Sequence, residues 1–500
     1  MRPALRDGVK LGGWFKIERH HTVLGDLQLD GPRTELHLHD DKPFDLEAES
    51  TLDIHGMLHD RTAVTLIDCV ARSRFGYANY GDNAFHFASA FPHFVVRGRR
   101  QLEARTPSIE GVSFRIDDAE LIFYDVQAFG QVVDARKIID TVIQARSNIN
   151  EDEIEIGRYP RVCYYTGKSE IARSDTSLGV VTIRHHAAPN LMFTPKGVGI
   201  NSQIVVHFDF ESCQTFDNTI RRVLMLLRFL EMLAGRPQNL EWLSLHLSGE
   251  DQDTNLEVYW CHRPERAAHG ERPTPHPADL PINAVKFKTD FSSILEWWLE
   301  TDQARADARS RFYSSFAMQS SYSIDRLIAA ANMFDLLPSD ALPYKRKLPD
   351  DIAYARRVAQ KEFKSLPKSD HRDAILGALG RLDQSTLRQK ILYRAEIVTN
   401  AMSDPPADVE FVVREAVKAR NHFVHGSKWN LDNTRQARVI PFLTRALEFI
   451  FAASEILDGG WRIREWEQRR SGVGHPFAET LFSWRECVAE IADAKTGSEP

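Results

Sequence analysis

The chain has 500 residues, a formal net charge of −7 at pH 7 and an apolar fraction of 43%. This length predicts several domains, with a core large enough to need no disulfide or metal staple. The acidic balance excludes a protein that binds polyanions over its whole surface. Five scattered cysteines, odd in number and without paired spacing, indicate a reducing compartment.

A soluble, cytoplasmic protein is expected from the hydropathy pattern. No apolar stretch typical of a secretory signal follows the first methionine. The most hydrophobic helical stretch, residues 223–233, is interrupted by Arg228 and Glu231 and is too short to span a bilayer. We therefore expect no contact with a membrane.

Residues 1–285 are expected to form a β-rich, sandwich-like domain. Many short runs in this half alternate apolar and polar residues, the period of a half-buried strand. Such runs, with turn residues between them, are typical of an antiparallel sandwich or barrel. One inserted helix is expected at about residues 217–235, ended by Gly235 and Pro237. The predicted strands are residues 34–39, 64–69, 86–89, 93–97, 112–116, 120–124, 180–184, 204–208, 243–247 and 255–260.

The second half of the chain changes to helical periodicity. A proline-rich segment, residues 262–281, is the predicted linker. Residues 290–480 are expected to form an all-α bundle, because the loops between the predicted helices are short. Residues 481–500 are expected to be a polar C-terminal tail. The predicted helices are residues 293–300, 323–337, 351–364, 370–379, 386–402, 407–425 and 434–457.

One segment of this helical half is strongly basic. Residues 344–394 contain thirteen Lys or Arg against six Asp or Glu. This local excess of +7 leaves −14 for the rest, since the whole chain carries −7. The segment indicates either a contact with a polyanion or ordinary solvated helix faces, and both interpretations stay open.

An arginine occupies an unexpected position in the helix predicted at residues 407–425. An apolar stripe steps through Val413, Val417, position 420 and Val424. Position 420 is therefore expected to be apolar, and it is arginine. A guanidinium on a core stripe is costly unless an anion meets it. That anion is either a structural carboxylate or a phosphate.

The neighbours of Arg420 suit proton transfer. Asn421 and His425 lie four residues apart on the same helix face, beside this arginine. His425 falls in the last turn, where the helix C-terminus favours its protonated form, and Gly426 suits the left-handed position beyond. A histidine can move protons near neutral pH while arginine grips phosphate. His422 points about 100° away from Asn421, so a supporting role is expected.

The helix predicted at residues 323–337 carries a second polar interruption. Continuing its apolar stripe leads to Asn332 or Asp335. Asp335 is therefore a candidate partner for Arg420, and Asn332 a candidate to orient an imidazole ring. The alternative is a buried ion pair that only fixes the register of the helices.

No other motif competes with this region. The sequence contains no CxxC, HExxH, P-loop or GxSxG pattern, and no GxGxxG after a strand. We therefore expect neither a metal nor a cofactor.

These residues carry a resemblance to a known family. Arg420-Asn421-x-x-x-His425, followed by Gly426, resembles the signature of the HEPN superfamily. Residues 330–338, Ala-Ala-Asn-Met-Phe-Asp-Leu-Leu-Pro, resemble the first core helix of ApeA-like HEPN proteins, which are bacterial anti-phage effectors. The N-terminal half is similar to their N-terminal domain at Gly12-Gly13-Trp14, Gly25, Gly56 and Val64-Thr-Leu.

The resemblance implies a metal-independent endoribonuclease of anti-phage defence, in which the N-terminal domain senses or restrains. Two HEPN domains would pair, giving a dimer or a higher even-numbered oligomer with Arg420, Asn421 and His425 at a shared cleft. The substrate would be RNA, with tRNA or another structured RNA among the candidates, and the phage trigger is unknown. Attack by a 2′-hydroxyl would leave a 2′,3′-cyclic phosphate and a 5′-hydroxyl.

Two other functions remain open from the sequence. The first is a catalytically silent HEPN-type module that dimerises or binds a ligand, with Arg420 held in an ion pair by Asp335. The second is a carbohydrate-binding sandwich fused to a helical scaffold, which would need an exposed aromatic platform.

Overall fold

The computed structural model describes residues 4–18, 21–46, 52–80, 83–146, 155–194, 197–249, 255–266, 274–343 and 348–496. Part of the predicted linker, residues 267–273, and the start of the basic segment, residues 344–347, lie outside the described residues. The chain divides into two compact units. The first comprises residues 1–230, 238–266 and 283–299, and the second comprises residues 231–237, 267–282 and 300–500.

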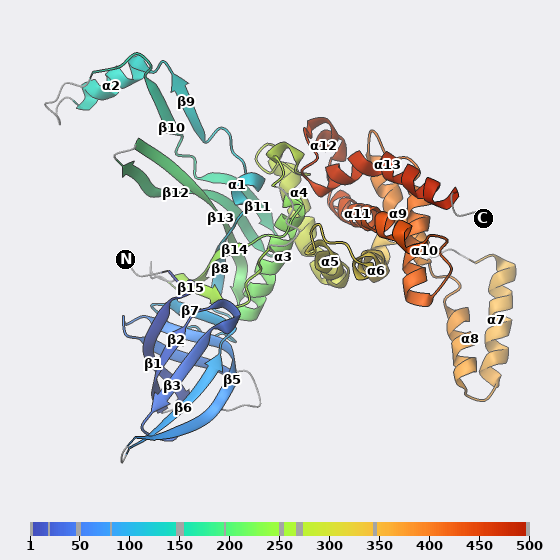
Figure 1. Cartoon of the computed structure of the whole chain (residues 1–500), viewed down its shortest axis with the longest axis horizontal. Coiled ribbons are helices and arrows are strands. Elements are labelled where there is room, and N and C mark those ends of the chain that lie inside the picture. Colours follow the sequence, from blue (N-terminus) through green and yellow to red (C-terminus); the bar gives the residue numbers. More distant parts are fainter. Residues whose placement is uncertain are drawn as a thin grey trace. The chain divides into compact units, whose positions relative to one another are not determined.

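The first unit is built on one antiparallel sheet. In the described residues it has thirteen strands in the order β11-β12-β13-β8-β14-β15-β7-β5-β4-β1-β2-β3-β6. Strand β6 also pairs with β5, so β1 to β6 close into a barrel (Figure 1). The strands are β1 Lys10–Glu18, β2 His21–Gln28, β3 Glu35–Asp40, β4 Leu52–Leu58, β5 Ala63–Tyr80, β6 Asn83–Phe91, β7 Phe94–Gly98, β8 Ile109–Ile116, β11 Glu170–Thr176, β12 Gly179–Thr194, β13 Gly197–Gln214, β14 Leu240–Leu247 and β15 Asn255–Trp260, with β9 Phe129–Val133 and β10 Arg161–Tyr165 paired separately.

The barrel interior explains two of the glycines that carried the resemblance. Phe15 is fully buried in the barrel core, where inward-facing residues alternate with exposed ones along β2. A Cβ atom at Gly25 or at Gly56 would lie 2.8 Å from a carbon of the Phe15 ring. Only glycine leaves room for this ring on both neighbouring strands.

Among the described residues, four helices belong wholly or mainly to this first unit. They are α1 Ala119–Ile122, α2 Arg136–Arg146, α3 Phe216–Ala234 and α4 Lys288–Glu300. The strand predicted at residues 120–124 is wrong, because this stretch forms the short helix α1 with Ala119 and Ile122 buried. Helices α3 and α4 pack through Phe229 and Trp298, whose indole Nε1 donates to the carbonyl of Met225 at 3.2 Å.

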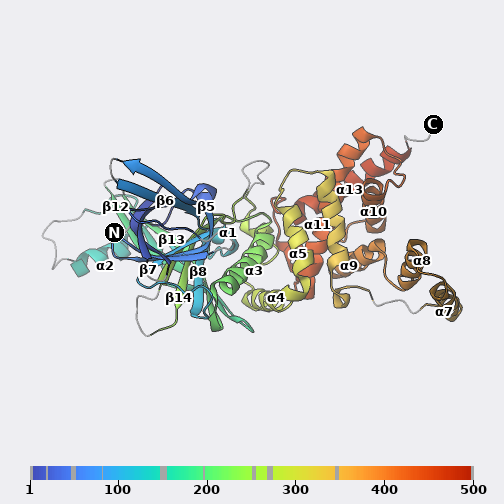
Figure 2. The same ribbon diagram turned by 90° about the horizontal axis from the view of Figure 1, so that it is seen from below.

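The second unit is a helical bundle around α11 (Figure 2). The β-rich half followed by a helical half confirms the predicted fold class. In the described residues the helices are α5 Asp302–Phe316, α6 Ile324–Asn332, α7 Asp350–Ser365, α8 Asp370–Gly380, α9 Leu387–Ala401, α10 Val409–His425, α11 Asn433–Asp458, α12 Ile463–Arg469 and α13 Pro476–Thr496, with the 3-10 turns η3 Met333–Leu336 and η4 Ser339–Ala341 after α6.

Two parts of this bundle differ from the prediction. Helix α5 was not predicted, because its buried face includes Arg305 and Arg309 and so lacks an apolar period. Residues 481–496 are not a polar tail, since they continue α13 and bury Trp484 and Ile491.

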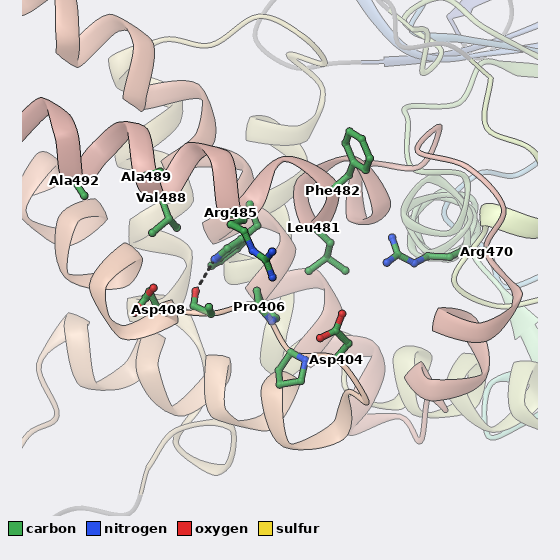
Figure 3. Close-up of a pocket in the computed structure, with 13 residues that line it drawn as sticks. Asp404, Pro406, Asp408, Arg470, Leu481, Phe482, Arg485, Val488, Ala489 and Ala492 are labelled. Atoms are coloured by element: carbon green, nitrogen blue, oxygen red, sulfur yellow. Dashed lines mark hydrogen bonds between the residues drawn. The ribbon is translucent and has the colours of Figure 1, made fainter.

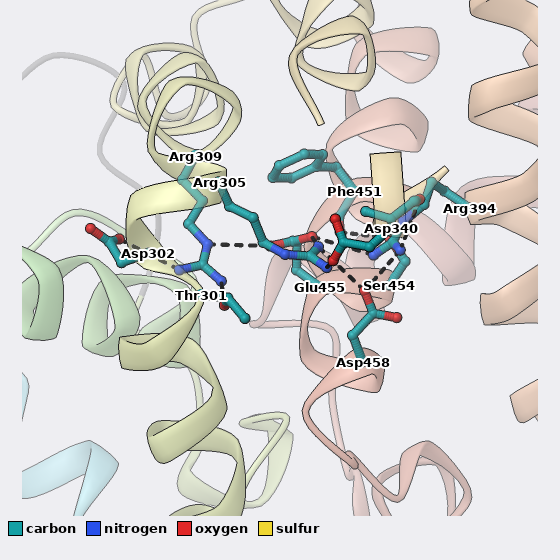
Figure 4. A network of polar contacts seen from close by, with 11 residues as sticks. Thr301, Asp302, Arg305, Arg309, Asp340, Arg394, Phe451, Ser454, Glu455 and Asp458 are labelled. Atoms are coloured by element: carbon teal, nitrogen blue, oxygen red, sulfur yellow. Dashed lines mark hydrogen bonds and ion pairs between the residues drawn. The ribbon is translucent and has the colours of Figure 1, made fainter. Parts of the chain in front are cut away.

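A buried polar cluster lies inside the bundle, and we call it the Glu455 hub (Figure 4). Arg305 and Arg309 of α5 and Arg394 of α9 all reach the carboxylate of Glu455 on α11. The Nε of Arg309 lies 3.2 Å, and an Nη of Arg394 3.3 Å, from its oxygens. Asp458 joins the hub at 2.8 Å from Arg394. The hub therefore ties three helices together by charge-assisted hydrogen bonds.

Candidate functional site

The candidate site lies at the C-terminal end of α10. The helix ends at His425, and Gly426 follows with a φ of 68°, the left-handed conformation that glycine adopts without strain. The Gly426 N–H donates to the carbonyl of His422 at 2.9 Å. This cap stops the helix directly after the histidine and leaves His425 exposed.

The apolar stripe predicted through position 420 is wrong in its second half. Val424 is 42% exposed, whereas Ala416 and Ala419 are fully buried. The alanines face the core because α10 packs against α6 and α11, and close helix contacts favour small side chains. Arg420 therefore lies at the edge of the buried face and is only partly buried.

Arg420 is held by neutral groups. Its Nε donates to Oδ1 of Asn332, at the end of α6, over 3.2 Å. One Nη donates to Oδ1 of Asn421 at 3.0 Å and to Nε2 of His425 at 2.9 Å. Within the described residues, no carboxylate pairs with this guanidinium. The structure thus brings together Arg420, Asn421, His425 and Asn332.

The contact with arginine assigns the hydrogen-bonding roles of the two nitrogens in a neutral His425 ring. A guanidinium only donates hydrogen bonds, so Nε2 of His425 must be the accepting nitrogen. The proton of the neutral ring is then on Nδ1. His425 therefore presents an unprotonated Nε2, the form required of a general base.

Asp335 does not pair with Arg420 as the sequence predicted. Its carboxylate lies 2.9 Å from Nζ of Lys390, on α9, and is exposed. The α6 helix gives way at Met333 to the 3-10 turn η3, which changes the angle at which the later side chains leave the axis. Asn332, on the last turn of α6, is the residue that reaches the arginine instead.

His422 supports the loop beyond α10. Its Nδ1 donates to the carbonyl of Ser427 at 2.7 Å. Its ring packs against Phe423, with centroids 5.0 Å apart, and lies 6.2 Å from the buried Trp429. This placement fixes the chain that follows His425 and keeps His422 out of the Arg420 contacts.

The arrangement has the parts needed to act on a phosphodiester. A partly exposed guanidinium supplies a planar, permanently charged fork that matches phosphate oxygens. An exposed imidazole lies beside it, and its Nε2 can take up a proton once the hydrogen bond from Arg420 is released. Asn332 and Asn421 fix the arginine without neutralising its charge.

A cavity of about 760 Å³ lies elsewhere in the same unit (Figure 3). Its walls include Asp404 and Asp408, before and at the start of α10, and Arg485 on α13. Asp408 occupies the N-cap position of α10 without a capping hydrogen bond from its side chain, at the opposite end of the 17-residue helix from His425. The cavity is therefore separate from the Arg420 contacts.

In the parts of the chain that the structure describes, no group of three or more His, Cys, Asp or Glu could hold a metal ion. Among the described helices, none combines the length and apolar character needed to cross a bilayer.

Sequence reasoning missed the Glu455 hub and Lys390. Nothing local shows that the buried Glu455 lies 150 residues after Arg305, 146 after Arg309 and 61 after Arg394. Arg305 and Arg309 are spaced i, i+4, the one signal that both face the same side of α5.

Comparison with known protein families accounts for most of the chain. A family model described as ApeA N-terminal domain 1 matches residues 10–298. A second, described as Apea-like HEPN, matches residues 328–461, which include Asn332, Arg420 and His425. No curated protein and no solved structure matches the chain. The predicted resemblance is confirmed, and the chain belongs to the ApeA family, with an ApeA-like HEPN domain in its helical half.

Proposed function

We propose that this protein is a metal-independent endoribonuclease of anti-phage defence that cleaves RNA at a site shared by two HEPN domains. The observation that carries the proposal is the guanidinium of Arg420. It is held by Asn332, Asn421 and His425, and no described carboxylate neutralises it. Membership of the ApeA family supports a role in defence.

In the proposed reaction, Arg420 binds the non-bridging oxygens of a phosphodiester. The incoming phosphate competes for the N–H group that now bonds to Nε2 of His425. The freed nitrogen then accepts the proton of the adjacent 2′-hydroxyl. The 2′-oxygen attacks phosphorus as the bond to the 5′-oxygen breaks.

The second HEPN domain supplies the acid. The leaving 5′-oxygen needs a proton, and one imidazole cannot be base and acid at the same moment. The His425 of a second copy, in its protonated form, would donate that proton. The products are a 2′,3′-cyclic phosphate and a 5′-hydroxyl, so no water, metal or oxidant is consumed.

The silent-module alternative has lost its main support. It required a permanent ion pair between Arg420 and Asp335, whereas Asp335 pairs with Lys390. For a carbohydrate-binding role, the aromatic side chains of Phe75 and Tyr77 on β5 and of Phe85 and Phe87 on β6 are exposed, but no further observation favours that ligand.

The test compares wild type with His425→Ala and Arg420→Ala on total RNA in EDTA, with and without lysate from phage-infected cells. We expect wild type to cleave and both variants to lose at least about a hundredfold in rate. The new 3′ ends should resist tailing until the cyclic phosphate is removed. His422→Gln is the matched control on the same helix end and should keep most of the activity.

Equal RNA decay in wild type and both variants would disprove the proposal. So would the absence of cleavage by wild type in the presence of infected lysate.

A further inference from the structure

Helices α7 and α8 form a hairpin that contributes nothing to the core. The two helices contact each other, and neither has a buried residue. Figures 1 and 2 show them side by side, away from the packed helices of the same unit. Thirty-one residues, from Asp350 to Gly380, are thus kept in the solvent. Because these residues do not pack in a core, their exposed side chains are available for binding.

One face of α7 carries an aromatic ring and a line of cations. Tyr354, Arg357, Lys361 and Lys364 are spaced i, i+3, i+7 and i+10, which places them on a common face of an α-helix. All four are exposed, and Tyr354 retains 64% of its accessible surface. We call these four residues the α7 stripe. Asp350, four residues before Tyr354 in the first turn, lies on the same face and is its one acidic residue within α7.

The cations of the α7 stripe differ from the other arginines of the hairpin. Arg356 pairs with Asp383 at 3.4 Å, and Arg372 donates to the carbonyls of Phe363 and Lys364. These two arginines hold the hairpin together. Within residues 348–496, no carboxylate pairs with Arg357, Lys361 or Lys364, so their charges remain available to an external anion.

The spacing and composition of the stripe suit single-stranded RNA. At a rise of about 1.5 Å per residue, the three cations follow each other at roughly 4.5–6 Å along the helix. A line of cations beside an exposed aromatic side chain binds the phosphates and stacks a base. An acidic protein partner would use the charges but would not need Tyr354 to present its ring to solvent.

Both ends of the hairpin lead back to the candidate site. The segment before α7 follows η3, where Asp335 bonds to Lys390 in the first turns of α9. Asn332, directly before η3, contacts Arg420. An RNA strand held on the hairpin is thereby tethered to the elements that position the arginine.

We propose that the α7 stripe is a second RNA-contact surface, which binds a single-stranded segment flanking the cleaved bond. The proposal rests on the proposed ribonuclease function. It assigns Arg357, Lys361 and Lys364 to phosphates and Tyr354 to a base, and it gives the stripe no part in the chemistry.

The test measures binding of a fluorescent single-stranded RNA to the full-length His425→Ala protein, which cannot cleave it, as salt is raised. In this background Arg357→Gln, Lys361→Gln and Lys364→Gln are combined. Loss of three phosphate contacts should make the slope of log K against log salt shallower by about 2. Tyr354→Ala should weaken binding by about tenfold with the slope unchanged. Exchanging the same positions to Arg357→Lys, Lys361→Arg and Lys364→Arg should preserve the slope.

Cleavage by protein with His425 intact separates the two proposals. The triple variant should raise KM and leave kcat unchanged, because the stripe does not touch the reacting atoms. A triple variant with wild-type slope, affinity and KM would overturn the RNA-contact surface even if wild type cleaves. Failure of wild type to cleave would refute the function, and the salt slope would still decide the role of the stripe.

Discussion

The Glu455 hub and the Arg420 site both depend on arginine, which has a structural role in the hub and a proposed functional role at the site. In the hub, Arg305, Arg309 and Arg394 are at most 4% exposed and share the carboxylate of Glu455. At the site, Arg420 is partly exposed and bonded only to amide oxygens and an imidazole. The comparison shows that the partner decides the role. A carboxylate neutralises the charge of an arginine, whereas a neutral partner orients the guanidinium and leaves its charge available to a ligand.

The histidines show the same contrast. His207 of β13 lies in the sheet, with its Nδ1 2.6 Å from the hydroxyl of Ser113. Burial, aided by the nearby Arg184, lowers the pKa of His207 to about 4 and keeps the ring neutral. His425, by contrast, is exposed at the C-terminal end of α10.

The largest effect is expected at the hub. Glu455→Ala leaves three buried arginines without their shared carboxylate and should lower the free energy of unfolding by about 3–5 kcal/mol. Urea denaturation of the full-length protein measures this change. Glu410→Ala is the matched control, because the pair of Glu410 with Arg388 is exposed and worth at most about 1 kcal/mol. Similar losses in the two variants would contradict the distinction between buried and surface pairs.

A smaller effect is expected at His207 on acidification. Its folded-state pKa of about 4 lies below the ordinary value of 6.5, so the unfolded chain binds the proton more readily. Stability is therefore full above about pH 6.5 and falls as the pH drops toward 4, by about 2 kcal/mol after allowance for partial exposure. His207→Gln should flatten this part of the stability profile. An unchanged profile would show that the ring is not held neutral.

The smallest effect is expected at Asp335. Asp335→Asn removes an ion pair with Lys390 in which the aspartate side chain is 40% exposed, so the stability change should stay within about 1 kcal/mol. RNA cleavage should continue at the wild-type rate, because Asp335 makes no contact with Arg420. A loss of activity as large as that of Arg420→Ala would restore Asp335 to the site.

The sequence predicted those features that depend on local pattern. The family motif at residues 420–426, the end of α10 at Gly426 and the change from strands to helices all follow from periodicity, caps and short motifs. The sequence singles out Gly25 and Gly56, but it does not predict that both make room for the ring of Phe15.

The errors arose where tertiary contacts override local pattern. The predicted apolar stripe through Val424 is wrong because Ala416 and Ala419 form the buried face instead. Their small side chains allow close packing of the helices. The predicted pairing of Asp335 with Arg420 is wrong because α6 changes to a 3-10 turn at Met333. Helix α5 was not predicted because its inward face is charged, and distant acidic residues, chiefly Glu455 and Asp458, make that burial favourable.

The most direct measurement of the central claim is Arg420→Ala with two readouts on one preparation, RNA cleavage in EDTA and urea denaturation. If the arginine serves phosphate, cleavage should fall at least about a hundredfold while the free energy of unfolding changes by no more than about 1 kcal/mol. A stability loss of about 3–5 kcal/mol, or cleavage at the wild-type rate, would instead make Arg420 a structural residue like those of the Glu455 hub.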